Sequence, residues 1–547
     1  MFSNWQLNMF HQLRTRIMRE KAICLVPLIA IWLCFTLAPY CTPFWDSGIY
    51  VSMGNSIAKG NGSTYLGHTF KYPPVFPFML ALIIVPFGYN FVLMRLVMVA
   101  SAVGSIWLAY LIVRDRSNRW LATGVMVSTA FSFPILYECT RLLSELPYMF
   151  FSLLAIRWIE RYARQADSWR SKTGYIAIGL IVVAYFTRIV GVTLFAGAIA
   201  YLTLGGTNIS RSWTNLKKAI IVGVILFTVL PLWLVRNHLS DNKFPPELRQ
   251  GLSYRKELFV TTTERPDAQT IRWTNLWERI KDNGDYYERL LSNIVSGKQK
   301  RVASRGKRRP DTRAQVITLL LLAGYLICVF RHRSLIECYL FFYLLTYILW
   351  PAHQKERFLV PIIPFLFYYL FRLLEQFTDG IRWLVRRVAQ WPDQRKMIEV
   401  FGVLILTGVF VQWNWATDMR IIRNEKSDSY YTGRYGVLVD FAKWITENAP
   451  DDAVLISSEP AFVQIILEDF ASQNKTNRKT YGFPWTEPSE VLQFMDRIGT
   501  SYVISVPSGR AKQHLHPAIK QHRDRFRKVH QYGKYVIYQM FPPKPSG

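Results

Sequence analysis

The chain has 547 residues, of which 51% are hydrophobic and 15% aromatic, and its formal net charge is +29. The apolar residues fall in runs of roughly 17–22, about the length of a helix that spans a bilayer, so a soluble multidomain protein is excluded. The basic residues lie mostly in short segments between these runs, where they set the orientation of a membrane protein. A nucleic-acid footprint would instead concentrate on one soluble face, so the charge does not indicate nucleic-acid binding.

The polar, basic residues 1–21 precede the first apolar run, residues 22–41. This run is longer than the apolar core of a signal peptide and has no small-residue cleavage site, so we expect an uncleaved first span with the N-terminus in the cytoplasm. Together the apolar runs predict about eleven spans within a membrane domain at 22–416, namely 22–41, 90–113, 120–137, 146–159, 174–187, 189–205, 219–239, 314–330, 335–351, 358–375 and 398–416. This number places the C-terminus outside a plasma or inner membrane.

Two outer loops are long enough to carry function. In the first, residues 42–74, Asp46 and Tyr50 share one side of a predicted helix that ends at the Gly-rich stretch 59–62. The following segment, Val75–Phe87, is too short to span comfortably and predicts an interfacial or re-entrant helix. The second loop, residues 240–313, contains a basic block at 298–309, which is tolerated outside because long loops translocate largely regardless of charge.

From about residue 430 the pattern becomes that of a small α/β domain, which we place at 430–547 on the extracytoplasmic side. Short apolar runs predict strands, and amphipathic stretches predict helices. The expected strands are 453–456, 501–506 and 535–538, and the expected helices contain Phe441 and Trp444, begin at Pro460, and cover 487–498.

Ionisable residues from five separate segments are predicted to meet at the outer membrane boundary. One arginine there would more often reach toward lipid headgroups, and Asp46 alone would equally suit a helix N-cap. Several cations with two carboxylates fit better with a site for an anionic, membrane-borne substrate. The residues are Asp46, Lys71, Glu145, Arg188, His353, Lys355 and Arg357.

The order of these motifs resembles a known family. Asp46, Lys71-Tyr72-Pro73-Pro74, Ser144-Glu145-Leu146-Pro147, Thr187-Arg188 and Lys355-Glu356-Arg357-Phe358-Leu359 follow one another as in the GT-C type integral-membrane glycosyltransferases that use polyprenyl-phosphate sugars. These include the protein O-mannosyltransferases and the aminoarabinose transferase that modifies lipid A. The resemblance is strongest over residues 40–200 and 350–370, and the C-terminal domain fits the aminoarabinose-transferase branch.

The resemblance implies a role for each residue. Asp46 matches the presumed general base, and Glu145 matches an acidic position at the mouth of the fourth span and is placed with Asp46 among the catalytic residues. Arg188 and Arg357, assisted by Lys355 or Lys71, match the positions that hold the lipid phosphate. Tyr50, Tyr72 and His353 are expected to line the substrate site.

Two departures from the family pattern weaken particular expectations. Many relatives have a second acid after the first, where this chain has Ser47, so a divalent metal is unsupported and no metal ligands are predicted. The aminoarabinose branch has Glu-Lys-Pro where this chain has Lys71-Tyr72-Pro73, which weakens the assignment of that sugar.

The chemistry of such a donor agrees with the residues. A polyprenyl-phosphate sugar already carries its leaving group, and the sequence has no glycine-rich nucleotide loop. The reaction needs a base for the acceptor hydroxyl, worth about 10²–10⁴-fold, and fixed cations for the departing phosphate. Direct displacement would invert the anomeric centre. The acceptor is a lipid, glycan or protein.

The alternatives are a polytopic lipid or glycan transporter or flippase, a glycan ligase, and a scaffold or receptor. A transporter typically has broken helices or charges near mid-membrane and repeated halves, which this sequence does not show. A scaffold or receptor would place its specificity in the soluble domain and would not need Asp46.

Overall fold

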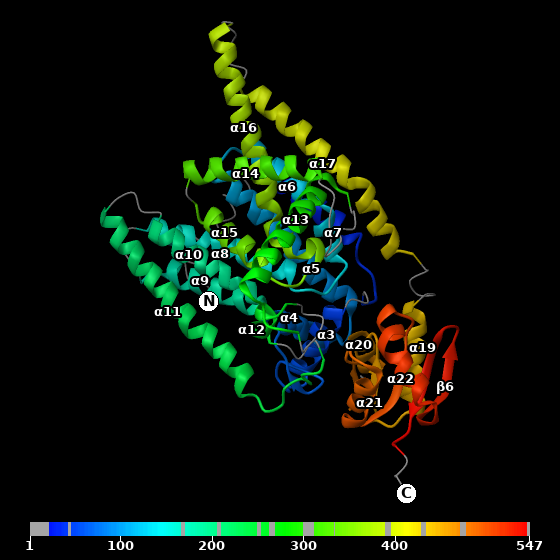
Figure 1. Ribbon diagram of the computed structural model, residues 1–547. Coiled ribbons are helices and arrows are strands. Elements are labelled where there is room, and N and C mark those ends of the chain that lie inside the picture. The colour runs from blue at the N-terminus through cyan, green and yellow to red at the C-terminus, as the bar shows by residue number, and fades with distance from the viewer. Residues whose placement is uncertain are drawn as a thin grey trace, which may run out of the picture.

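The computed structural model describes residues 21–41, 45–165, 170–204, 209–248, 253–261, 268–298, 311–332, 334–388, 395–427, 434–470 and 477–543. A body of helices carries a small α/β part at one end, beside α3 (Trp45–Ala58), while α16 (Ile363–Val388) and α17 (Arg395–Glu425) reach the opposite end (Figure 1). This confirms the predicted class, an α-helical polytopic membrane protein with a small C-terminal α/β part.

Every predicted span contains a helix. The remaining helices of the membrane body are α2 (Leu25–Cys34), α4 (Val75–Phe87), α5 (Phe91–Arg114), α6 (Arg119–Ala130), α7 (Phe133–Cys139), α8 (Glu145–Arg164), α9 (Lys172–Thr187), α10 (Val192–Leu204), α11 (Ile209–Leu239), α14 (Thr312–His332) and α15 (Leu335–Leu349). Among the described residues, five helices are long and apolar enough to cross a membrane, or six if the bent pair α6–α7 is one span. Because α9, α10 and α15 are shorter than a comfortable crossing, the count of eleven spans stays a prediction.

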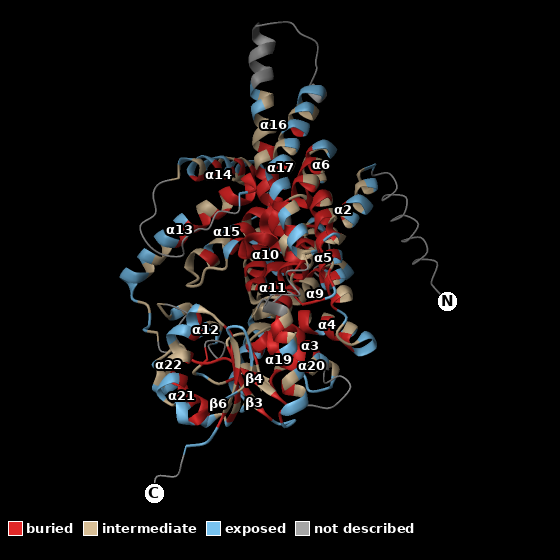
Figure 2. Ribbon diagram, turned by 90° about the vertical axis from the view of Figure 1, so that its right-hand side faces the viewer, coloured by how far each residue is buried: buried red, intermediate tan, exposed pale blue. Residues whose placement is uncertain are grey.

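The helices divide into a buried centre and a lipid-facing rim (Figure 2). In the apolar 18-residue stretch of α5, 61% of the residues are buried. In the corresponding stretches of α11 and α17, only 22% and 17% of the residues are buried. Small residues explain the tight centre, since a Cβ added to Gly104 would lie 2.7 Å from the Phe150 ring of α8. The rim helices turn large apolar side chains such as Phe227 and Phe401 outward, as expected of a protein surrounded by lipid.

The bend between α6 and α7 is satisfied from within the protein. The two helices meet at 52°, which leaves the first backbone N–H groups of α7 without helical partners. The side-chain carbonyl of Asn414, a fully buried residue of α17, accepts a hydrogen bond from Phe133 N at 3.1 Å. A polar side chain inside the membrane body therefore stabilises the break, as irregular backbone at this depth requires.

The C-terminal part is a five-stranded sheet in the order β4-β3-β5-β7-β6. The strands are β3 (Val454–Ser457), β4 (Lys479–Tyr481), β5 (Thr500–Ser505), β6 (Phe526–Tyr532) and β7 (Tyr535–Met540), and the main helices are α19 (Arg434–Asn448), α20 (Pro460–Phe470), α21 (Pro488–Arg497) and α22 (His516–Gln521). Strands β4, β3 and β5 run parallel, while β5, β7 and β6 are antiparallel. Each predicted strand and helix is found; β4 and β6 were not predicted.

The segments between spans also contain the predicted elements. The interfacial helix has the predicted bounds, Val75–Phe87. The long loop folds into α12 (Tyr254–Phe259) and α13 (Trp273–Ser296), and the 3-10 helix η4 (Lys355–Ile362) leads into α16. Apart from Lys298, the basic block at 298–309 lies outside the described residues.

Candidate active site

Asp46 lies in the first turn of α3, where the helix dipole favours a negative charge. Its side chain is 20% exposed and accepts two hydrogen bonds. The Tyr72 hydroxyl donates to Oδ1 at 2.8 Å, and Arg357 Nη1 donates to Oδ2 at 2.5 Å. Asp46 is therefore bound by two other segments of the chain, which argues against a simple helix cap.

Glu145 brings the two predicted phosphate-binding arginines together. It begins α8, is fully buried, and pairs through Oε1 with both Arg357 Nε and Arg188 Nη1. Arg188 ends α9 and Arg357 belongs to η4, so three helix termini meet at this carboxylate. With Asp46, the cluster contains two carboxylates and two guanidinium groups, and pairing at this depth offsets the cost of burying four charges.

Two tyrosines fix the carboxylate side of this cluster. The Tyr50 hydroxyl is 2.9 Å from Ser144 Oγ, and the Tyr50 ring stacks on Tyr72 with centroids 4.9 Å apart. Burial and the nearby Asp46 carboxylate raise the pKa of the Tyr72 hydroxyl well above its ordinary value. Tyr72 therefore stays protonated and donates to Asp46 throughout the physiological pH range.

Lys71 lies beside the cluster but is engaged by the long loop. Its ammonium group is 2.5 Å from Glu257 of α12 and 5.4 Å from the centre of the Tyr254 ring. Burial raises the pKa of the Tyr254 hydroxyl, and Asp46 and Glu257 both contribute to that rise. The two contacts of Lys71 place α12 beside the segment that carries Tyr72, which the sequence alone did not predict.

The remaining two predicted residues support the chain before η4. His353 stacks on Tyr286 of α13 with centroids 4.1 Å apart, and its Nε2 is 2.6 Å from Asn283 Oδ1. Lys355 has a left-handed backbone, φ +54°, and its N–H donates to the Tyr286 hydroxyl at 3.0 Å. Its side chain is exposed and makes no ion pair within the described residues. These contacts tie the start of η4 to α13 and so set the position of Arg357.

The C-terminal domain packs directly against the helix that carries Asp46. A Cβ added to Gly48 would lie 2.6 Å from the backbone oxygen of Ala461 in α20, so only glycine permits this approach. At the end of α20, Glu468 accepts hydrogen bonds from Ser52 Oγ at 2.9 Å and Asn55 Nδ2 at 3.0 Å. It also accepts one from the Tyr89 hydroxyl at 2.6 Å. The soluble domain is thus part of the scaffold of the site.

Among known proteins, this chain resembles solved structures but matches no sequence family. No protein-family model and no curated protein matches the sequence. ArnT from Cupriavidus metallidurans in the apo state superposes with a TM-score of 0.57 at 12% identity, over 94% of this chain and 97% of that one. The same protein bound to undecaprenyl phosphate gives 0.52, with the same identity and coverage. The oligosaccharyltransferase AglB from Archaeoglobus fulgidus, in complex with an inhibitory peptide and a dolichol-phosphate, gives 0.54 at 14% identity, over 89% of this chain and 70% of that one.

This chain has the GT-C fold. The predicted fold is thereby confirmed, although the motifs on which the prediction rested are short and loose. Within the fold, Asp46, Tyr50, Tyr72, Glu145, Arg188 and Arg357 come together as predicted. Lys71 lies next to them on Glu257, while His353 and Lys355 act on the chain that precedes Arg357.

The structure also bears on metal binding. Among the described residues, no three side chains of the metal-binding types lie together. Ser47, which stands where many relatives have a second acid, is fully buried, and its hydroxyl has no hydrogen-bond partner in the described part of the chain. A second carboxylate at this position would be buried in the protein.

Proposed function

We propose that this chain is a glycosyltransferase that moves a sugar from a polyprenyl-phosphate donor to an acceptor hydroxyl. The observation that carries the proposal is the cluster of Arg188 and Arg357 with Asp46 and Glu145, at the end of the membrane body that meets the soluble domain. The GT-C fold adds support, because the solved structures that share it include complexes with undecaprenyl phosphate and dolichol-phosphate.

The two arginines suit the leaving group of this reaction. A guanidinium group presents several N–H donors in one plane and binds a phosphate through two of them. Arg188 and Arg357 are held side by side by Glu145, and their side chains are 13% and 6% exposed. A phosphate that reaches them leaves most of its water behind, which strengthens the interaction with the charge that develops on the leaving oxygen.

Asp46 is the base in this proposal, and its ion pair links base activity to donor binding. Without substrate, Arg357 Nη1 and the Tyr72 hydroxyl bind the two carboxylate oxygens, which lowers the tendency of Asp46 to accept a proton. A donor phosphate competes for Arg357, because both groups are anions that seek the same N–H donors. The base is therefore freed when the donor is in place.

The reaction then proceeds in one displacement. The acceptor oxygen forms a bond to the anomeric carbon while the bond between that carbon and the phosphate oxygen breaks. The phosphate leaves with the electron pair and stays on Arg188 and Arg357, and the acceptor proton passes to Asp46. Attack opposite to the leaving group inverts the anomeric centre.

Glu145 has a positioning role in this scheme, not that of a second acid or base. It is fully buried, and its Oε1 is already shared by two guanidinium groups. Removing it would leave two buried cations with one partner, Asp46, which would then bind Arg357 more firmly. Glu145 therefore sets the spacing of the arginines and leaves Asp46 as the base.

The transporter alternative receives less support. The charges of the cluster lie at one end of the membrane body, and the likeness to AglB, an oligosaccharyltransferase, favours group transfer. We further propose that the cluster and the C-terminal domain face away from the cytoplasm, as the basic short loops predict.

The test uses two arginines of the same helical segment. Arg357→Lys should weaken binding of undecaprenyl phosphate to the purified protein by about tenfold or more, because lysine offers a point charge without the planar fork. Arg372→Lys is the matched control, since Arg372 lies 15 residues after Arg357, on α16, and pairs with Glu375. Equal affinity of wild type and Arg357→Lys would overturn the phosphate assignment, and analysis of glycolipids from a deletion strain would identify the product.

A further inference from the structure

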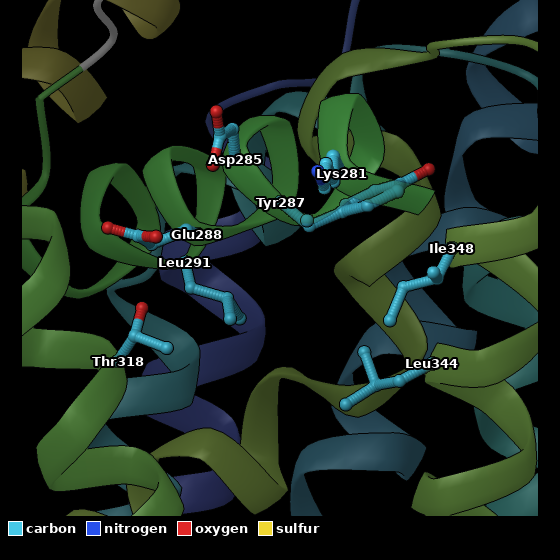
Figure 3. Close-up of a pocket in the computed structure, with 9 residues that line it drawn as sticks. Lys281, Asp285, Tyr287, Glu288, Leu291, Thr318, Leu344 and Ile348 are labelled. Carbon is cyan, nitrogen blue, oxygen red and sulfur yellow. The ribbon is translucent and has the colours of Figure 1, made fainter. Parts of the chain in front are cut away.

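A cavity of about 530 Å³ opens between α13, α14 and α15 (Figure 3). Aromatic rings separate it from the Asp46 cluster. Tyr287 lines the cavity, and its ring centroid is 6.3 Å from that of Tyr347. The Tyr347 ring stacks on Phe358 with centroids 4.4 Å apart, and the Arg188 guanidinium lies 5.8 Å from the centre of the Phe358 ring. The cavity is therefore a second site and not an extension of the first.

One side of the cavity carries charge. Lys281, Asp285 and Glu288 lie along α13 at spacings of four and three residues, which places them on one face of the helix. Within the described residues none of the three makes an ion pair. Burial and the nearby Asp285 raise the pKa of the Glu288 carboxyl. The face thus offers one cation, followed by two carboxylates that make no ion pair within the described residues, although Arg289, next to Glu288 in the chain, partly offsets its charge.

Two hydroxyl groups at the cavity also lack partners. Tyr287 is only 4% exposed, and its hydroxyl makes no hydrogen bond in the described part of the chain. The same holds for Thr318 Oγ1 on α14. In Figure 3 the Tyr287 ring lies between α13 and Ile348, above the floor of the cavity. Buried polar atoms nearly always have a partner, so these two hydroxyl groups point to a ligand that forms hydrogen bonds.

The floor is apolar and continues onto the lipid-facing surface. Leu291, Leu344 and Ile348 form it, and the neighbouring Leu345 of α15 is 40% exposed. At the start of α13, Trp273 is 87% exposed, as is typical of residues that anchor a helix at the membrane–water boundary. The cavity therefore opens at headgroup level.

We propose that this cavity binds a zwitterionic phospholipid whose headgroup ends in a primary ammonium, as in phosphatidylethanolamine. Lys281 binds the phosphate, and the ammonium donates to Asp285 and Glu288 and to the hydroxyl oxygens of Tyr287 or Thr318. The acyl chains follow the apolar floor. Lys281 and Asp285 are separated by about 6 Å along the helix axis, which suits a phosphate and an ammonium joined by two carbons.

The charges exclude other lipids. An anionic lipid such as phosphatidylglycerol carries the same phosphate charge but no ammonium, so its net negative charge would face two carboxylates without compensation. A choline headgroup carries the positive charge but has no N–H to donate to the hydroxyl groups and carboxylates. The proposal does not depend on the glycosyl transfer, and it can fail or hold separately from it.

Native mass spectrometry of the purified full-length chain tests the proposal. Phosphatidylethanolamine, phosphatidylcholine and phosphatidylglycerol with the same acyl chains are titrated separately. We expect the phosphatidylethanolamine adduct at about tenfold lower lipid concentration than the other two, the difference that one or two charge-assisted hydrogen bonds produce. Glu288→Gln and Asp285→Asn should remove this preference. Glu278→Gln, an exposed carboxylate of the same helix, is the matched control and should keep it.

Several results would overturn the proposal. One is equal binding of the three lipids by the wild type, which indicates apolar contact alone. A second is tighter binding of phosphatidylglycerol, which indicates an anion site. A third is the same loss in Glu278→Gln as in Glu288→Gln, which indicates a general effect of charge on α13. The comparison of lipids on the wild type stands even where a variant does not fold.

Discussion

Replacing Asp46 with asparagine should separate catalysis from donor binding, because the two are predicted to change in opposite directions. Asparagine keeps the shape of the side chain but cannot accept the acceptor proton, so turnover should fall by about 10²–10⁴-fold. At the same time Arg357 loses its bond at 2.5 Å to a carboxylate that competes with the donor phosphate.

The size of the gain in binding follows from that lost bond. A hydrogen bond to a charged group contributes about 1.5–3 kcal/mol, and the 20% exposure of Asp46 places this pair toward the lower end. Undecaprenyl phosphate should therefore bind Asp46→Asn about tenfold more tightly than it binds wild type. Arg357 remains paired with Glu145, so the variant should insert and fold.

The assay measures both quantities on the same preparation. Titration calorimetry in detergent gives the affinity for undecaprenyl phosphate, and transfer of a radiolabelled sugar from a polyprenyl-phosphate donor gives turnover. Asp115→Asn is the control, because Asp115, which follows α5, also pairs with an arginine at 3.0 Å, namely Arg157, which lies 12 residues after Glu145 on α8. Turnover of Asp46→Asn within threefold of wild type would refute the assignment of the base. Weaker lipid binding by this variant would refute competition for Arg357.

Four further predictions concern the surroundings of the site. Glu468→Ala should lower turnover by at least about tenfold, because Glu468 fixes α3 through hydrogen bonds, and Glu468→Gln should retain more of the turnover. Equal turnover of both variants and wild type would show that α3 is held by packing alone. Burial lowers the pKa of His68, whose Nε2 is 2.9 Å from the Tyr481 hydroxyl, so the folded state favours the neutral ring and loses stability as pH falls below about 6.5. His68→Gln should reduce the fall in melting temperature between pH 7 and 5, and an unchanged fall would exclude His68 as its cause. Removal of divalent cations with a chelator should leave turnover unchanged, and restoration by added Mg²⁺ or Mn²⁺ after a loss would contradict this. Ser489→Cys, in a background without the native cysteines, should react with an impermeant reagent in intact cells; protection would place the soluble domain in the cytoplasm.

The sequence predicts helices better than contacts. Each apolar run that predicted a span contains a helix, and two prolines identified Val75–Phe87, because these signals are local. Convergence of Asp46, Glu145, Arg188 and Arg357 was also predictable, since the topology places their helix ends at one boundary. Their pairing could not be predicted, because no local pattern shows that the Glu145 carboxylate forms ion pairs with both guanidinium groups.

Other parts of the site could not be predicted because their partners are distant in sequence. Lys71 pairs with Glu257, and nothing near either residue indicates the other. The short strand β4 has three residues and lacks a periodic signal of its own. Glu468 looks like an ordinary polar residue on the outer face of an amphipathic helix. Only the fold shows that this face meets α3.

The hydrogen bonds between α3 and α20 have a consequence for the synthesis of the protein. Ser52 and Glu468, which hydrogen-bond to one another, are separated by 416 residues. At 5–20 residues per second, the ribosome needs roughly 20 to 80 s to add the second partner after the first. During that interval the helix that bears Asp46 lacks the surface against which it packs. The helix that bears Asp46 is therefore among the first elements to be synthesised and among the last to reach its working conformation. A chain that stops before residue 468 would form its helices without completing the site.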